Sequence, residues 1–279
     1  MQPVTRRLTP FYSRCLCSLL TSVALIASVA QADSPTWQKI AYKTPATPSL
    51  HNLAQRHYAL LDHFLTDALQ GQGKTDFLHV TAQTKNNIQW HNEHGVNAYN
   101  EAFRRSHEFV KTVDLQGMPD TVLLIPYMES QWHGTRGKKS ADYGYWQLVP
   151  EVLREIQTLD YLPTPVREGD IDAVRTDATL STQAALAHLH RYYFYFAKVA
   201  KFSESEAWLM TFIAFNWGAG NCKRLIATMQ TKGEAVNFSN FYHELYLIQQ
   251  QQPGDKSLRA AVEYVPSLWN IARLLKNTN

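Results

Sequence analysis

The sequence predicts an all-α fold on three observations. Apolar residues recur at spacings of three and four through most of the chain, which is the period of a helix that buries one face. Helix-start signals stand before several of these stretches. The stretches lack the apolar–polar alternation of strands, so we expect a minor hairpin at most.

The first elements are expected to be helices. Apolar residues recur with helical period over residues 50–69, and Gly71 is expected to end that helix. Residues 77–90 and 98–113 are predicted to form two further helices, with a loop at residues 92–97 between them. Together they form an N-terminal helical extension.

An almost entirely apolar helix is predicted next, and it ends at Glu129. Met118–Asp120 is a start signal, because proline is tolerated at the first helical position and an acid suits the helix dipole. Apolar side chains on every face of Val122–Met128 indicate a helix packed on all sides. Pro126 has no backbone N–H, so a local kink is expected there. Burial would raise the pKa of Glu129 and make it a candidate general acid; the alternative is a carboxylate that emerges into solvent.

The second half is also expected to be helical. Ser181 is predicted to cap one helix, and Ser203 with Glu206 fits a capping box that starts another over residues 207–215. Irregular structure is expected at residues 159–179 and 249–252.

Residues 1–32 have the composition of a secretory signal peptide. A basic start precedes the apolar stretch 16–29, and small residues end at Ala32. The stretch is interrupted by serine and threonine and is shorter than the roughly 20 residues of a spanning helix, which favours cleavage over a retained anchor. We expect export to the periplasm or cell envelope with cleavage near Ala32. Only Cys222 would remain, so no internal disulfide is expected.

The net charge and the spacing of the histidines indicate neither a nucleic-acid partner nor a metal site. The net charge of +3 is mild and the cations are scattered, so a nucleic-acid partner is not expected. His91 and His94, and separately His188 and His190, match no zinc motif. We predict no metal, no cofactor and a monomer.

Several short motifs follow Glu129 in order. Gly144, Gln147 and Pro150 lie in YGYWQLVP, AFNWGAGN spans residues 214–221, and YVP spans residues 264–266. Their order and spacing resemble those of lytic murein transglycosylases with an SLT catalytic domain, closest to the membrane-bound type D branch. The resemblance covers roughly residues 100–275. It implies a lysozyme-like domain at residues 99–279, after the signal peptide (1–32) and the linker with helical extension (33–98).

The resemblance also implies the reaction and the site. In this family one acid/base residue protonates the glycosidic oxygen of peptidoglycan strands, and the 6-hydroxyl of N-acetylmuramic acid attacks its own anomeric carbon to give a 1,6-anhydro product. Glu129 would be that residue, and the Tyr264 hydroxyl would orient it. The residues expected to bind substrate are Ser130, Tyr143, Gly144, Tyr145, Trp146, Gln147, Asn216, Trp217 and Tyr264. Core packing is the alternative for the aromatic residues among them, and loop bracing for the two amides.

The chain departs from the family pattern between Glu129 and Gly144. Lys138 stands where the family usually has serine, Ala141-Asp142 replaces a Gly-Ala pair, and Phe215 replaces a tyrosine. A lysine close to Glu129 would lower the pKa of Glu129. Asp142 is either part of a solvated loop or a second carboxylate that activates water, as in goose-type lysozymes. A third hypothesis is a non-catalytic peptidoglycan-binding scaffold.

Overall fold

The computed structural model describes residues 49–89 and 95–277, which lie in a single compact unit. The predicted signal peptide, nearly all of the predicted linker, and His91 and His94 lie outside the described residues. None of the described helices combines the length and hydropathy that a membrane span requires.

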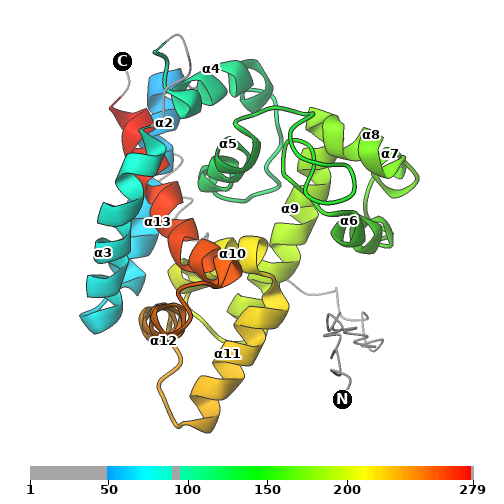
Figure 1. Cartoon of the computed structure of the whole chain (residues 1–279). Helices are drawn as coiled ribbons and strands as arrows, with labels where there is room; N and C mark the ends of the chain where they lie inside the picture. The colour runs from blue at the N-terminus through cyan, green and yellow to red at the C-terminus, as the bar shows by residue number, and fades with distance from the viewer. Residues whose placement is uncertain (1–48, 90–94, 278–279) are drawn as a thin grey trace, which may run out of the picture. The chain divides into compact units, whose positions relative to one another are not determined.

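The prediction of an all-α fold is confirmed. Within the described ranges, the extended pairings are two isolated antiparallel bridges, Gly137–Tyr143 and Tyr143–Leu148. The helices (Figure 1) are α2 (Leu50–Ala68), α3 (Gly71–Ile88), α4 (Ala98–Val110), the 3₁₀ helix η1 (Asp120–Leu123), α5 (Leu124–Ser130), α6 (Pro150–Gln157), α7 (Thr164–Arg167), α8 (Ile171–Thr176), α9 (Ala178–Phe194), the π-helix η2 (Tyr195–Val199), α10 (Glu204–Trp217), α11 (Ala219–Thr231), α12 (Phe238–Gln251) and α13 (Lys256–Lys276).

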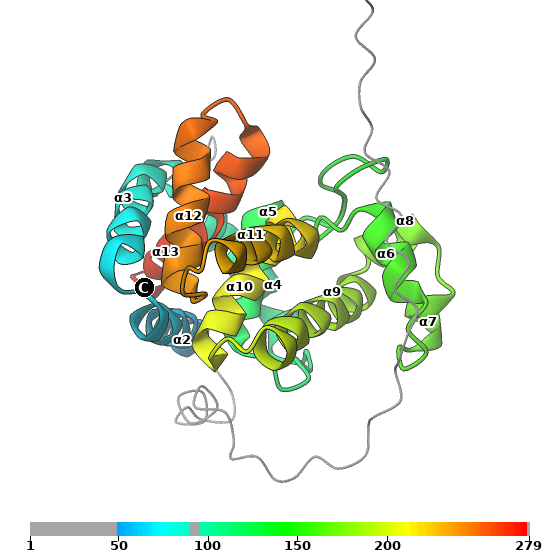
Figure 2. The ribbon, with the colours of Figure 1, turned by 90° about the horizontal axis from the view of Figure 1, so that it is seen from below.

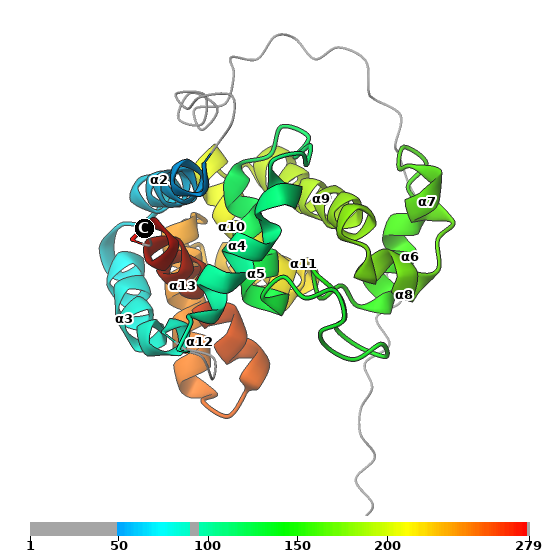
Figure 3. The same cartoon turned by 90° about the horizontal axis from the view of Figure 1, so that it is seen from above.

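Helix α10 is the centre of the fold. Its residues are apolar on nearly every face, and Ala207–Ala214 are all buried. Helices α2, α9, α11 and α13 pack against it. Figures 2 and 3 show α2, α3, α12 and α13 grouped on one side, with α6, α7 and α8 on the other and α9 and α10 between them.

The N-terminal helices share the core of the later helices. Leu53, Leu60 and Phe64 on α2 are buried at helical spacing, and α2 and α3 both pack against α13. Arg56 on α2 also pairs with Asp120 of η1 at 2.6 Å. The predicted boundary at residue 98, between the helical extension and the lysozyme-like domain, stays a prediction. The helices before and after residue 98 contribute to the same hydrophobic core.

Of the two predicted helix caps, one is confirmed and one is wrong. The capping box of Ser203 and Glu206 is confirmed. Ser181 is not a cap, because the Asp177 carboxylate accepts hydrogen bonds from the N–H groups of Thr179 and Leu180, both at 2.8 Å, and α9 begins at Ala178.

Three segments are more helical than predicted. The stretch 159–179, predicted to be irregular, holds the short helices α7 and α8, because Asp170 caps α8 and Pro163 stands just before α7. The tract 249–252, predicted as a loop, continues α12 to Gln251, since glutamine is a good helix former. The prediction that Gly71 ends the first helix is wrong: α2 ends at Ala68, and Gly71 is the first residue of α3.

Candidate active site

The helix that carries Glu129 is shorter than predicted. The chain enters it as the 3₁₀ turn η1 and becomes α-helical only at Leu124. Pro126 is therefore the third residue of α5, where a backbone N–H would have no partner inside the helix. The expected disruption at Pro126 takes the form of this change of helix type before the proline, and α5 then runs regularly to Ser130.

Two residues in left-handed backbone conformation end α5 directly after Glu129 and Ser130. Gln131 and Trp132 have φ values of 53° and 58°, which non-glycine residues adopt rarely and at some cost in stability. Packing holds them there, because the Trp132 side chain is buried between two aromatic rings. The centre of its ring lies 5.1 Å from that of Phe109 and 4.9 Å from that of Tyr145. The abrupt end leaves Glu129 at the rim of the core.

Tyr264 holds the Glu129 carboxyl group. Its hydroxyl donates a hydrogen bond to Glu129 Oε1 at 2.7 Å, across 135 residues of sequence. Burial raises the pKa of the Tyr264 hydroxyl well above its usual value, and the neighbouring carboxylate raises it further. Tyr264 therefore stays protonated and remains a donor at neutral pH.

The pKa of Glu129 is raised to about 7, mainly because burial disfavours its charged form. The hydrogen bond from Tyr264 opposes this, and the negative charge of Asp142 adds to it. Near neutral pH the side chain therefore exists in both protonation states, which is the property of a group that must donate a proton and later accept one.

A buried hydroxyl compensates for the proline next to Tyr264. Pro266 lies inside α13 and cannot donate to the carbonyl of Val262, four residues earlier. The Tyr242 hydroxyl on α12 donates to that carbonyl at 2.8 Å. Tyr242 is fully buried, so this bond ties α12 to α13 at Val262, two residues before Tyr264.

Glu129 opens into a cavity of about 200 Å³. The cavity lies between α5, α13 and the end of α10, and its lining residues are Met128, Glu129, Asn216, Ala260, Glu263, Tyr264 and Ser267. Glu263 is a carboxylate that the sequence analysis missed, although it directly precedes Tyr264. Partial burial raises the pKa of Glu263, and Arg259 opposes the shift.

A second cavity of about 250 Å³ adjoins the first at Asn216, which lines both. Helix α9, the end of α10 and the segment after Ala141 form its walls. Its lining residues are Asp142, Gln147, Leu148, Val149, Val152, His188, Tyr192, Phe215, Asn216, Trp217 and Gly218. Aromatic rings beside amide and carboxylate groups suit a sugar, which has apolar faces and hydroxyl edges.

His188 is a lining residue that was not predicted as part of the site. Burial lowers the pKa of its imidazole to about 4, so the ring is neutral at neutral pH. It lies 4.2 Å from the ring of Tyr192, centroid to centroid.

Several predicted substrate-binding residues instead brace the walls. Trp146 is fully buried and its indole N–H donates to Thr182 Oγ1 at 2.9 Å, which fits the core-packing alternative for this residue; its contact with substrate stays a prediction. Ser130 is also fully buried, and its hydroxyl donates to the carbonyl of Tyr145 at 2.7 Å, so it links α5 to the loop of residues 131–149 that joins α5 to α6.

Three more predicted site residues lie in the loop itself. Gln147 is partly exposed at the second cavity, and its amide N–H group bonds the carbonyls of Arg136, at 2.9 Å, and Gly144, at 2.7 Å. Tyr143 is buried at the two bridges. Tyr145 packs against Trp132 and keeps partial exposure. Of the nine predicted substrate-binding residues, those that line a cavity are Gln147, Asn216, Trp217 and Tyr264.

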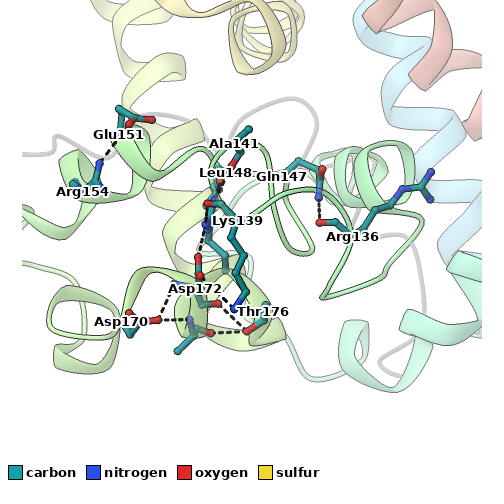
Figure 4. A network of polar contacts seen from close by, with 12 residues as sticks. Arg136, Lys139, Ala141, Gln147, Leu148, Glu151, Arg154, Asp170, Asp172 and Thr176 are labelled. Carbon is teal, nitrogen blue, oxygen red and sulfur yellow. Dashed lines mark hydrogen bonds and ion pairs between the residues drawn. The ribbon is translucent and has the colours of Figure 1, made fainter.

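Arg175 holds the loop in place, and sequence reasoning missed it. Its fully buried guanidinium donates to the carbonyls of Lys139, Ala141 and Leu148 at 2.5, 2.7 and 3.0 Å, and it pairs with the Asp172 carboxylate. These partners converge in Figure 4. The only sequence signal was the i, i+3 spacing of Asp172 and Arg175, which is common on helix surfaces.

Gly144 is required where the loop meets α8. Its φ is 86°, and a Cβ there would lie 2.0 Å from the carbonyl oxygen of Arg175. The N–H of Tyr145 bonds the same carbonyl at 3.3 Å. The glycine thus allows close backbone contact and does not line a cavity.

Two loop residues that differ from the family pattern, Asp142 and Lys138, lie in different surroundings. Asp142 is exposed at the second cavity, and its charge reaches Glu129. Lys138 is exposed, and its backbone N–H donates to the carbonyl of Asp142 at 2.9 Å. The loop charge that acts on Glu129 is the negative one of Asp142, which raises the pKa; a lysine would have lowered it.

The part of the chain that holds Glu129 and the loop is similar to known proteins. Residues 107–238 match the model of the family described as Transglycosylase SLT domain. Two relatives, from Escherichia coli strain K12 and from Escherichia coli O6:H1, both carry the name Membrane-bound lytic murein transglycosylase D. Each is 29% identical over 171 residues, which is 60% of this chain and 30% of the relative. The chain therefore matches under a third of the length of these relatives.

These matches confirm the resemblance that the motifs indicated. The matched family range contains Glu129, the cavity-lining loop and the end of α10. It ends at residue 238, before the helix that supplies Tyr264.

Proposed function

We propose that this protein is a lytic transglycosylase that cleaves the bond between N-acetylmuramic acid and N-acetylglucosamine in peptidoglycan and forms a 1,6-anhydro end. The observation that carries the proposal is the pair Glu129–Tyr264: a carboxyl group with a pKa of about 7, held at 2.7 Å by a phenol and open to a cavity. The SLT family match and the two relatives support it.

Glu129 performs both proton transfers in this mechanism. Its protonated form donates to the glycosidic oxygen as the bond to the anomeric carbon breaks. The resulting carboxylate then removes the proton of the 6-hydroxyl as that oxygen attacks the anomeric carbon, so Glu129 ends the cycle protonated. A pKa near 7 suits both steps, because neither protonation state is strongly favoured. Tyr264 is a positioning residue that keeps the carboxyl group in one orientation.

The two adjoining cavities form the proposed glycan cleft. Asn216 lies at their junction, with Trp217 and Gln147 along the second cavity, so these three side chains are proposed to contact the strand. The intramolecular attack requires only that the sugar be held in position, and such positioning can supply a large share of the rate acceleration.

Hydrolysis is the second candidate reaction, and the position of Asp142 supports it. This carboxylate lies at the adjoining cavity and acts electrostatically on Glu129. If Asp142 activates a water molecule, the product has a reducing end instead of an anhydro end. The third candidate, a binding scaffold, would leave the glycan intact.

Digestion of purified sacculi followed by mass analysis of the fragments separates the three. We expect anhydro ends from the natural protein, and loss of cleavage in Glu129→Gln with retained binding to sacculi. Reducing ends that disappear in Asp142→Asn would support the hydrolase. Cleavage that survives in Glu129→Gln would refute the assignment of the acid.

Export to the cell envelope, action as a monomer, and the division at residues 32 and 98 are further parts of the proposal. The substrate class supports export, since peptidoglycan lies outside the cytoplasmic membrane. The mass of the protein purified from an exporting host tests cleavage after Ala32.

A further inference from the structure

His188 is a buried imidazole in the wall of the second cavity. It lies on α9, is only 4% exposed, and lines the cavity of about 250 Å³ that adjoins the catalytic one. Aromatic rings enclose it: the centre of its ring lies 4.2 Å from that of Tyr192 and 6.1 Å from that of Phe215. Burial lowers the pKa of this ring and keeps it neutral at neutral pH, so one ring nitrogen carries a proton and the other is an acceptor.

The two ring nitrogens of His188 have different surroundings. Nδ1 is buried and has no hydrogen-bond partner in the part of the chain that the structure describes. The edge of the ring that reaches the cavity is therefore the one that carries Nε2. A buried N–H group without an acceptor is rarer in proteins than an unpaired acceptor, which places the proton on Nε2. His188 thus presents an N–H donor to the cavity.

The surroundings of this donor match the chemistry of an N-acetyl group. Such a group has a carbonyl oxygen that accepts a hydrogen bond, an N–H that donates one, and an apolar methyl group. In the same cavity His188 offers a donor and the Asp142 carboxylate offers an acceptor, while Phe215 and Trp217 offer apolar ring surface. A sugar hydroxyl in the same place would have no methyl group to pack against these rings.

We propose that His188 is a specificity-determining residue, and that its Nε2–H donates a hydrogen bond to the carbonyl oxygen of a glycan N-acetyl group whose methyl group packs on the aromatic wall. The inference rests on the proposed function, because it places the glycan in this cavity. It adds the sugar substituent that is recognised and the residue that recognises it. Asn216 lines both cavities, so the recognised sugar lies beside the one at Glu129.

Calorimetric titration with two tetrasaccharides tests the proposal. Tetra-N-acetylchitotetraose carries an N-acetyl group on every sugar, and cellotetraose has the same linkages with hydroxyl groups in those positions. All proteins carry Glu129→Gln, so that sugar is bound without cleavage. We expect His188→Phe, which keeps a ring in the wall, to weaken the binding of the acetylated sugar by roughly tenfold, the effect of one neutral hydrogen bond, and to leave cellotetraose binding unchanged. His188→Gln should retain most of the affinity, because its amide N–H reaches about as far as Nε2.

Nitrogen NMR of protein with isotope-labelled histidine reads the tautomer directly. We expect an unprotonated Nδ1 and a protonated Nε2 in His188, with His188→Phe assigning the signals. Addition of the acetylated tetrasaccharide should shift the Nε2 signal, since that N–H gains an acceptor, whereas cellotetraose should not shift it. This measurement does not depend on cleavage.

His190→Phe is the matched control. His190 lies two residues further along α9 and is exposed, so the same substitution there should bind both tetrasaccharides like the unsubstituted protein. Thermal unfolding checks that each variant is folded. Digestion of sacculi by the natural protein tests the proposed reaction separately.

Three outcomes would overturn the role of His188. The first is binding of the acetylated tetrasaccharide that is absent or that His188→Phe leaves unchanged. The second is an equal loss for both sugars, which would mean that His188 only shapes the cavity. The third is a proton on Nδ1. Each of these leaves the proposed reaction standing if sacculi still yield anhydro ends. Binding that depends on His188, without any cleavage of sacculi, would instead count against the reaction and not against His188.

Discussion

At the scale of single residues, the proposed chemistry depends on opposing effects at Glu129. Burial raises its pKa, and the phenol of Tyr264 lowers the pKa by stabilising the carboxylate. The acid must be protonated to start the reaction, so activity should fall as the pH rises through about 7. The stability of the fold should change in the same direction. Because the folded state disfavours the ionised form of Glu129, the free energy of unfolding should decrease as the pH rises from about 4.5 to 7.

Tyr264→Phe should move the falling limb of the kcat–pH profile to higher pH. Removal of the hydrogen bond takes away a contribution that lowers the pKa of Glu129. The maximal kcat should also fall by roughly tenfold to hundredfold, because the carboxyl group is no longer held in one orientation. Tyr246→Phe on α12 is the control and should leave the profile unchanged. A lower kcat with an unmoved limb would mean that the phenol orients the carboxyl group but does not lower the pKa of Glu129.

Gly144→Ala should destabilise the protein more than Gly233→Ala. Both glycines have left-handed φ values, 86° and 73°, so both substitutions carry a backbone cost of about 1 kcal/mol. At Gly144 the added methyl group also meets the carbonyl of Arg175 at 2.0 Å, whereas at Gly233 nothing lies within 4 Å. We expect an additional loss of about 2 kcal/mol for Gly144→Ala, measured by urea unfolding. Equal losses would show that the contact relaxes at no cost.

At the scale of secondary-structure elements, irregular positions place the site. Helix α5 ends abruptly at two left-handed residues, α13 continues through a proline, and the cleft wall is a loop held by Arg175. Each irregularity has a specific partner that compensates for it.

The Tyr242–Pro266 arrangement predicts a coupled effect on stability. Tyr242→Phe leaves the Val262 carbonyl without its donor and should cost about 1–3 kcal/mol in the free energy of unfolding. In a Pro266→Ala background the helix N–H at residue 266 can fill that role, so the same substitution should cost less. A double-mutant cycle measures the difference. Additive effects would show that the hydroxyl does not compensate for the proline.

At the scale of the whole molecule, α13, the helix that carries Tyr264, packs against the N-terminal helices α2 and α3. Helix α13 carries Tyr264 on one face and packs against α2 and α3 on another. Loss of α2 and α3 would expose part of the apolar surface of α13, which is now buried.

Deletion of residues 1–97 should therefore give a protein without a cooperative unfolding transition. Circular dichroism during heating and limited proteolysis both test this expectation. Deletion of residues 1–48 is the control and should leave the described helices folded. A stable fragment that begins near residue 99 would instead support the predicted domain boundary as a folding boundary.

The helices and the candidate acid could be predicted because their signals are local. Periodic apolar residues, the capping box at Ser203 and the acid at the end of an apolar helix all depend on neighbours within a few positions. The order of the motifs also indicated the SLT resemblance that comparison confirmed. The misassigned cap at Ser181 shows the limit even here, because Asp177 was an equally local and better cap.

The tertiary structure alone decided which side chains face the cleft. Trp146 and Gln147 are adjacent in sequence, yet one is core and the other lines a cavity, because the loop bends at Gly144 over Arg175. Sequence reasoning suggested the Glu129–Tyr264 contact only through the resemblance, since 135 residues separate the pair and local signals do not reach that far. The sequence by itself determined the helical fold and the candidate acid. The packing of α5, α10 and α13 determined the cavity, the raised pKa and the hydrogen bond at that acid, because these arise from contacts between distant segments.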